Sequence, residues 1–157
     1  MNNATMSVHD TQSRKLDDFE NPVPVGLPGA SALGVLRELQ QWGNVVTIVL
    51  HGGSVFEFKG PFPKGEESRG YYNLDGPIPG FHGHLKLSAI DYIGFQERPH
   101  AGRPAYALTF NSLSHGNIFK VFLGRDTNGE VCGEQLQRFA ALKRAAVPLN
   151  TLKENVE

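Results

Sequence analysis

The chain has 157 residues, of which 39% are hydrophobic and 10% aromatic, and this fits one globular domain rather than a disordered segment. It carries 15 basic and 16 acidic residues, so no basic face for nucleic acid is expected. Cys132 is the only cysteine, which excludes an internal disulfide and fits a reducing compartment. The longest apolar run, residues 45–50, is too short to span a bilayer, so we expect a cytoplasmic protein without membrane insertion.

Residues 1–30 are polar and then rich in proline and glycine, which predicts an extended or disordered lead-in. A helix is predicted over residues 31–42, because apolar side chains recur on one face and Gly43 would end it. Residues 60–70 hold two prolines and three glycines and are expected to form a loop. Alternating or β-rich segments predict strands at residues 45–51, 54–59, 71–74, 82–87, 90–97, 105–111 and 117–123.

The order of these elements predicts an α+β fold. Short turns between consecutive strands favour an antiparallel β-sheet meander, and a second helix is predicted over residues 133–146. The helices at the two ends would pack on the sheet, so residues 31–147 form a single domain. The polar tail, residues 148–157, is expected to fray.

His51 ends an apolar strand directly before Gly52 and Gly53, which predict a tight hairpin turn. A histidine in this place has two interpretations. It is either a structural side chain or a ligand, because an imidazole at a sheet edge can bind iron. The two glycines would leave room for a large planar group beside the backbone.

His82 and His84 lie two residues apart on a predicted strand, so their side chains share one face. Such a pair could bind a divalent metal, but no Asp, Glu or Cys at matching spacing completes a ligand set. The pair can equally consist of two ordinary exposed surface histidines. Nearby basic residues could bind the carboxylates of an amphipathic acid or form ordinary solvated surface: Lys59, Lys64, Arg69 and Lys86.

Motifs for a catalytic serine, a phosphate-binding loop or a zinc protease are absent from the sequence, so no enzyme is predicted.

An ordered series of segments resembles the bacterial haem-utilisation cytosolic carriers of the HutX/ChuX type. These segments are WGNVVTIVLHGGSVFEFKGPFPKG at 42–65, GYYNL at 70–74, GHLKL at 83–87, GR at 102–103, FKVFLGRD at 119–126 and EQLQRFAAL at 134–142. They span about two-thirds of the chain. The resemblance implies a haem-carrier fold of antiparallel sheet with flanking helices, and a homodimer.

The resemblance also implies a function. The chain would bind imported haem for iron acquisition and hand it to a downstream haem-degrading or haem-storing protein. His51 and His84 match the family's haem histidines, and Tyr92 is the nearest match to the tyrosine that binds iron in some members. In the mechanism that we expect, Phe56 and Phe58 contact the macrocycle, which is mostly apolar. A basic rim that includes Lys86 and Arg69 would bind the propionates.

The chain departs from the family pattern in two places. A longer helical segment usually precedes the Trp-Gly pair, whereas this lead-in is rich in proline, and His100 stands where an apolar residue is usual. His100 is either an extra ligand or an exposed loop histidine. Two rival functions remain open: a haem-degrading or iron-releasing enzyme on a similar sheet, and a regulatory module whose haem binding is incidental.

Overall fold

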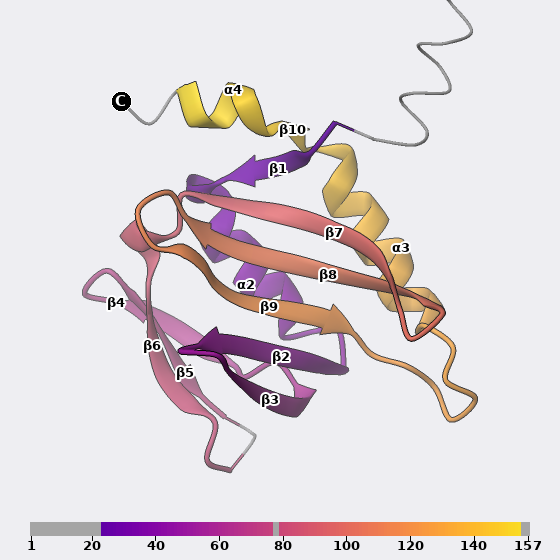
Figure 1. The fold of residues 1–157 in the computed structure, drawn as a ribbon. Helices are drawn as coiled ribbons and strands as arrows, with labels where there is room; N and C mark the ends of the chain where they lie inside the picture. Colours follow the sequence, from indigo (N-terminus) through magenta and orange to yellow (C-terminus); the bar gives the residue numbers. More distant parts are fainter. Residues whose placement is uncertain (1–22, 77–78, 155–157) are drawn as a thin grey trace, which may run out of the picture.

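The computed structural model describes residues 23–76 and 79–154, and within them it has the expected α+β architecture (Figure 1). The strands form a seven-stranded sheet and a separate three-stranded sheet, and every named strand pair is antiparallel. In chain order the elements are β1 (Val25–Pro28), η1 (Gly29–Ser31), α2 (Ala32–Leu39), β2 (Asn44–His51), β3 (Ser54–Pro61), β4 (Gly65–Ser68), β5 (Tyr71–Asp75), β6 (His82–Lys86), η2 (Leu87–Ala89), β7 (Tyr92–His100), β8 (Arg103–Ser112), β9 (Gly116–Leu123), α3 (Gly133–Arg144), β10 (Val147–Pro148) and α4 (Leu149–Glu154).

The strand order differs from that of one continuous meander. The strand order in the large sheet is β10-β1-β7-β8-β9-β2-β3. Strand β2 therefore pairs with β9 as well as with β3, its neighbour in the chain. Strands β4, β5 and β6 leave this sheet and form their own meander. The expected loop at residues 60–70 is therefore wrong in part, because β4 lies inside it and pairs with β5 from Gly65↔Leu74 to Ser68↔Tyr71. Pairing with a neighbour overrides the weak strand propensity of this segment.

Helices α2 and α3 both lie behind the large sheet in Figure 1, on the same face. Leu36 and Leu39 of α2 are fully buried, and Phe139 of α3 packs edge-on against Phe95 of β7 and Tyr106 of β8. The inner face of the small sheet joins the same hydrophobic core, mainly through Tyr72, Leu74 and Leu85. None of the described helices covers the opposite face of the large sheet.

Gln135 fixes the position of α3 against the start of β2. Its side chain is only 3% exposed, its Nε2 donates to the carbonyl oxygens of Trp42 and Asn44 at 2.8 Å, and its Oε1 accepts from the backbone N–H of Gly124 at 2.8 Å. Three backbone groups from two different connections are thus satisfied by one amide, as buried polar groups require.

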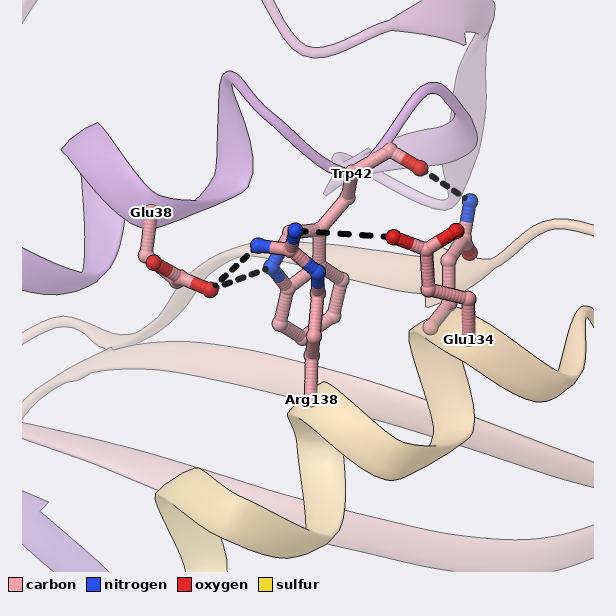
Figure 2. A network of polar contacts seen from close by, with 5 residues as sticks. Glu38, Trp42, Glu134 and Arg138 are labelled. Atoms are coloured by element: carbon pink, nitrogen blue, oxygen red, sulfur yellow. Dashed lines mark hydrogen bonds and ion pairs between the residues drawn. The ribbon is translucent and has the colours of Figure 1, made fainter.

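A second polar network joins α2 to α3 at their surface (Figure 2). Arg138 Nη1 donates to Glu38 Oε1 at 2.9 Å, and the Trp42 indole N–H donates to the same oxygen at 3.2 Å. Arg138 also lies 3.5 Å from Glu134 one turn earlier on α3. The network connects the two helices. Since these charged groups are about one-third exposed or more, it adds little to stability.

Helices and strands are also present on both sides of residues 31–147. Strand β1, part of the expected lead-in, pairs with β7 on one side and with β10 on the other. The start of the predicted frayed tail forms α4, whose first residue Leu149 donates its N–H to the Pro24 carbonyl. The remainder of the lead-in, residues 1–22, lies outside the described residues. Among the described helices, none has the length and apolar character that crossing a membrane would need.

Candidate ligand-binding site

The sequence predicts a tight hairpin turn after His51, and the structure has this turn between β2 and β3 and exposes His51 to solvent. Gly52 and Gly53 take positive φ values of 56° and 78°, and the register pairs His51 with Ser54. Phe56 is paired with Val49, so it lies on the same face as His51 and diagonally across from it. The Phe56 ring is 52% exposed and is free to contact a ligand.

Phe58 lies on the same face as Phe56 but is less exposed. Its ring stacks on Phe81, with centroids 4.3 Å apart and planes 15° apart. Phe81 meets the edge of Phe62, which stacks in turn on Phe119. This series of rings runs from the hairpin into the core, and it fixes the small sheet against β3.

The outer face of the small sheet carries the second group of predicted residues. His82, His84 and Lys86 alternate along β6 and are all exposed, which confirms that the two histidines share a face. Arg69 lies in the β4–β5 turn, where the backbone N–H of Leu87 donates to the Gly70 carbonyl at 3.1 Å. That bond brings the turn to the end of β6. The turn that carries Arg69 therefore lies at the same end of the small sheet as Lys86.

Two residues that the sequence did not point to contact His84. Its Nδ1 lies 2.6 Å from Oδ1 of Asn73, and the Tyr71 ring approaches it edge-on with centroids 6.4 Å apart. Both come from β5, where Asn73 pairs with His84 and Tyr71 with Lys86. The alternation of GYYNL indicates that Tyr71 and Asn73 share a face, but only the strand register shows which histidine they meet.

A hollow of about 330 Å³ lies between β6 and the β8–β9 connection. It combines apolar and polar groups, and it is lined by His84, Leu85, Lys86, Ala89, Ile90, Ser112, His115, Ile118 and Phe119. His51 is not among the lining residues. Because ligand sites commonly enclose about 300–1,000 Å³, this hollow can enclose only part of a large planar ligand and would leave the rest accessible.

Two further candidates lie elsewhere in the sheet. Tyr92 is in β7, and the order of strands places β8 and β9 between it and β2. Its role as an iron ligand stays a prediction. His100, at the exposed end of β7, lines a hollow of about 430 Å³ on the open face of the sheet, together with Lys59 and Arg125.

A dedicated site for a free metal ion is not found in the described part of the chain, because no group of three or more His, Cys, Asp or Glu side chains comes together there. Haem makes a smaller demand, since the porphyrin supplies four nitrogen ligands and the protein adds one or two. His51 and His84 are both exposed, and either imidazole could supply such a ligand.

Fold and site together define a class: an α+β protein whose two antiparallel sheets carry exposed histidines, His51 and His84. The chain belongs to the haem utilisation ChuX/HutX family, whose family model matches residues 25–142.

Individual relatives agree with this. The chain is 43% identical over 116 residues to HutX of Vibrio cholerae serotype O1, an intracellular haem transport protein, and the match covers 74% of this chain and 60% of HutX. The structure of the haem-binding protein ChuX superposes with a TM-score of 0.71 at 29% identity, covering 92% of both chains. Escherichia coli ChuS, a haem oxygenase, shares the fold with a TM-score of 0.66 at 17% identity, and the match covers 88% of this chain but 45% of ChuS.

Proposed function

We propose that this protein is a cytoplasmic haem carrier, which binds haem reversibly and hands it on. The observation that carries the proposal is the exposed His84 imidazole, held by β5 at the edge of a partly apolar hollow. The proposal is supported by membership of the haem utilisation family and by the 43% identity to an intracellular haem transport protein.

Each predicted residue receives a role from its position. His84 or His51 would bind the iron through an imidazole nitrogen, and the exposed ring of Phe56 would cover part of the macrocycle. Lys86 and Arg69 would bind the propionates. Phe58 would contact the macrocycle beside Phe56, and its stacking on Phe81 would hold its ring in place.

A carrier role, without catalysis, fits the openness of these residues. His51, His84 and Lys86 are all exposed, whereas oxygen activation on haem requires a distal pocket of controlled polarity and access. The likeness to the haem oxygenase ChuS is at 17% identity and concerns the fold alone. The receiver of the haem would be a haem-degrading or haem-storing protein that serves iron acquisition.

We further propose that the protein is a homodimer and that the open face of the large sheet forms its interface. Leu50 and Val55 are paired across β2 and β3 on this face, and they are 49% and 59% exposed. Ile48 and Phe122 extend the same apolar surface as lining residues of the larger hollow. A second copy that presents the same surface would bury it symmetrically.

A haem titration followed in the Soret region tests the carrier proposal. Wild type should bind one haem per chain, His84→Ala and His51→Ala should each weaken binding, and the double variant should weaken it most. His82→Ala is the matched control, because His82 is exposed on the same face of the same strand. Unchanged affinity and spectrum in the double variant would refute the site, and no saturable binding by wild type would refute the function.

Transfer and turnover separate the carrier from the enzyme. Loaded protein mixed with excess apomyoglobin should lose its haem intact, as the myoglobin spectrum appears. Incubation with haem, a reductant and oxygen should reduce the iron and shift the Soret band, but it should not destroy the band. Conversion to biliverdin would instead identify a haem-degrading enzyme.

A further inference from the structure

The orientation of the Asn73 side chain is determined by two carbonyl groups. Asn73 Nδ2 donates to the backbone oxygen of Glu66 at 3.1 Å and to that of Tyr71 at 3.4 Å. A carbonyl oxygen only accepts hydrogen bonds, so the opposite orientation of the amide would bring oxygen against oxygen. Oδ1 therefore points toward β6, where it meets Nδ1 of His84 at 2.6 Å.

This contact determines which nitrogen of His84 carries the proton. Asn73 Oδ1 can only accept, so His84 Nδ1 must donate. A neutral imidazole has one N–H, and the other ring nitrogen keeps its lone pair. The lone pair is then on Nε2, at the far end of the ring from Asn73.

The register explains why this applies to His84 and not to its neighbour. Asn73 is directly opposite His84 across β5 and β6, whereas His82 is opposite Asp75, which has no amide. The Tyr71 ring is also nearly perpendicular to the His84 ring, at 85° with centroids 6.4 Å apart. Of the two histidines on this face, only His84 has an amide opposite it whose orientation other groups determine.

We infer that Asn73 is a positioning residue for haem binding: it holds His84 in the Nδ1–H tautomer and leaves the Nε2 lone pair available to iron. This inference rests on the proposed haem-carrier function. A neutral amide is a weaker acceptor than the carboxylate that often supports metal-bound histidines. It orients the ligand without making the imidazole strongly electron-donating, which suits a protein that must release its haem.

The tautomer can be tested without haem. Long-range ¹H–¹⁵N correlation spectra of the wild-type protein at a pH of about 9, where free imidazole is neutral, distinguish protonated from unprotonated ring nitrogens. His84 should show a protonated Nδ1 and an unprotonated Nε2. In Asn73→Leu the preference for Nδ1–H should be lost, while His82 in the same spectra should not change. An Nε2–H tautomer of His84 in wild type would overturn the inference, whatever the outcome of haem binding.

The haem-bound protein gives a second readout. Asn73→Asp should raise the iron–histidine stretching frequency of the ferrous form in resonance Raman spectra and should slow haem transfer to apomyoglobin by about tenfold. Asn73→Leu should weaken haem binding by about tenfold, within the range found for partners of metal-bound histidines. Identical iron–histidine frequencies in wild type and Asn73→Asp would overturn the positioning role. Failure of wild type to bind haem would instead refute the proposed function and leave the tautomer result intact.

Discussion

Phe58 of β3 stacks on Phe81, the residue directly before β6, with ring centroids 4.3 Å apart. This contact joins the hairpin that carries His51 to the small sheet that carries His84. The two candidate haem histidines come from different sheets, so their relative placement depends on such contacts between the sheets.

Phe81→Ala should destabilise the protein by about 3 kcal/mol, because it leaves a cavity beside Phe58 and Phe62. It should also weaken haem binding, since the small sheet would no longer be held against the hairpin. Urea unfolding followed by circular dichroism measures the first effect. A loss of less than about 0.5 kcal/mol would show that the stack does not hold the two sheets together.

Phe56→Ala should change the free energy of unfolding little and should lower haem affinity. The ring is 52% exposed, so the free energy of unfolding should change by less than about 1 kcal/mol. Haem affinity should fall about fivefold, because an aromatic contact of about 1 kcal/mol to the macrocycle is lost. Val147→Ala, at a residue that is 38% exposed in β10 at the opposite edge of the large sheet, is the control and should leave affinity unchanged.

Gln135→Leu should cost about 3 kcal/mol or more, since it leaves the Gly124 N–H and the carbonyl oxygens of Trp42 and Asn44 without their partner. Gln137→Leu on the exposed side of the same helix controls for helix propensity and should be nearly neutral. Thermal and urea unfolding of the two variants, measured side by side, provide the comparison. Equal stability of the two variants would contradict the bridging role of Gln135.

Tyr72 makes stability depend on alkaline pH. Burial raises the pKa of its hydroxyl above the ordinary value of 10.0, and the nearby Arg37 offsets this only in part. As the pH rises, the unfolded chain loses this proton first. The contribution to stability is complete below pH 10.0 and is lost as the pH rises toward the folded-state pKa.

The test for Tyr72 is the free energy of unfolding in urea, measured from about pH 8 to about pH 11. Tyr72→Phe should flatten the alkaline decline, even though it also loses the hydrogen bond from Gln40 Nε2. Tyr71→Phe, at a tyrosine that is 38% exposed, should keep the wild-type slope. A wild-type slope in Tyr72→Phe would show that other groups cause the decline.

The homodimer proposal predicts that charge on the open sheet face will separate the subunits. The double variant Leu50→Lys, Val55→Lys should elute as a monomer and keep its circular dichroism spectrum, because both side chains are already exposed. Leu113→Lys should behave like wild type. Light scattering after size exclusion gives the mass directly. A monomeric wild type, or a dimeric double variant, would contradict the proposed interface.

Much of the local structure is readable from the sequence, and the reason is periodicity. The alternation of residues 54–59 places Phe56 and Phe58 on one face, and the H-x-H spacing places His84 on the same face as His82, as the structure confirms. The separate small sheet was not predictable in this way. Its strands β4, β5 and β6 have only four or five residues each, and no local pattern shows which of two sheets a short strand will join.

The sequence indicates which residues could contact haem, but it does not indicate which residues contact one another. Asn73 is one polar residue in GYYNL, and its meaning depends on the register across β5 and β6, which pairs it with His84. Strand alternation gives the face of a side chain but not its partner on the next strand. The same limit applies to Phe81, whose stacking on Phe58 crosses between sheets.

The pairing of β1 with β10 brings the two ends of the described chain together at one edge of the large sheet, while β3 forms the opposite edge (Figure 1). The described residues near both ends, in β1 and β10, therefore lie across the sheet from the His51 hairpin. Protein tethered to a solid support by its C-terminus would present the hairpin outward, with the whole width of the sheet as a spacer. Haem exchange with a soluble acceptor could then be followed on immobilised molecules that all face the same way.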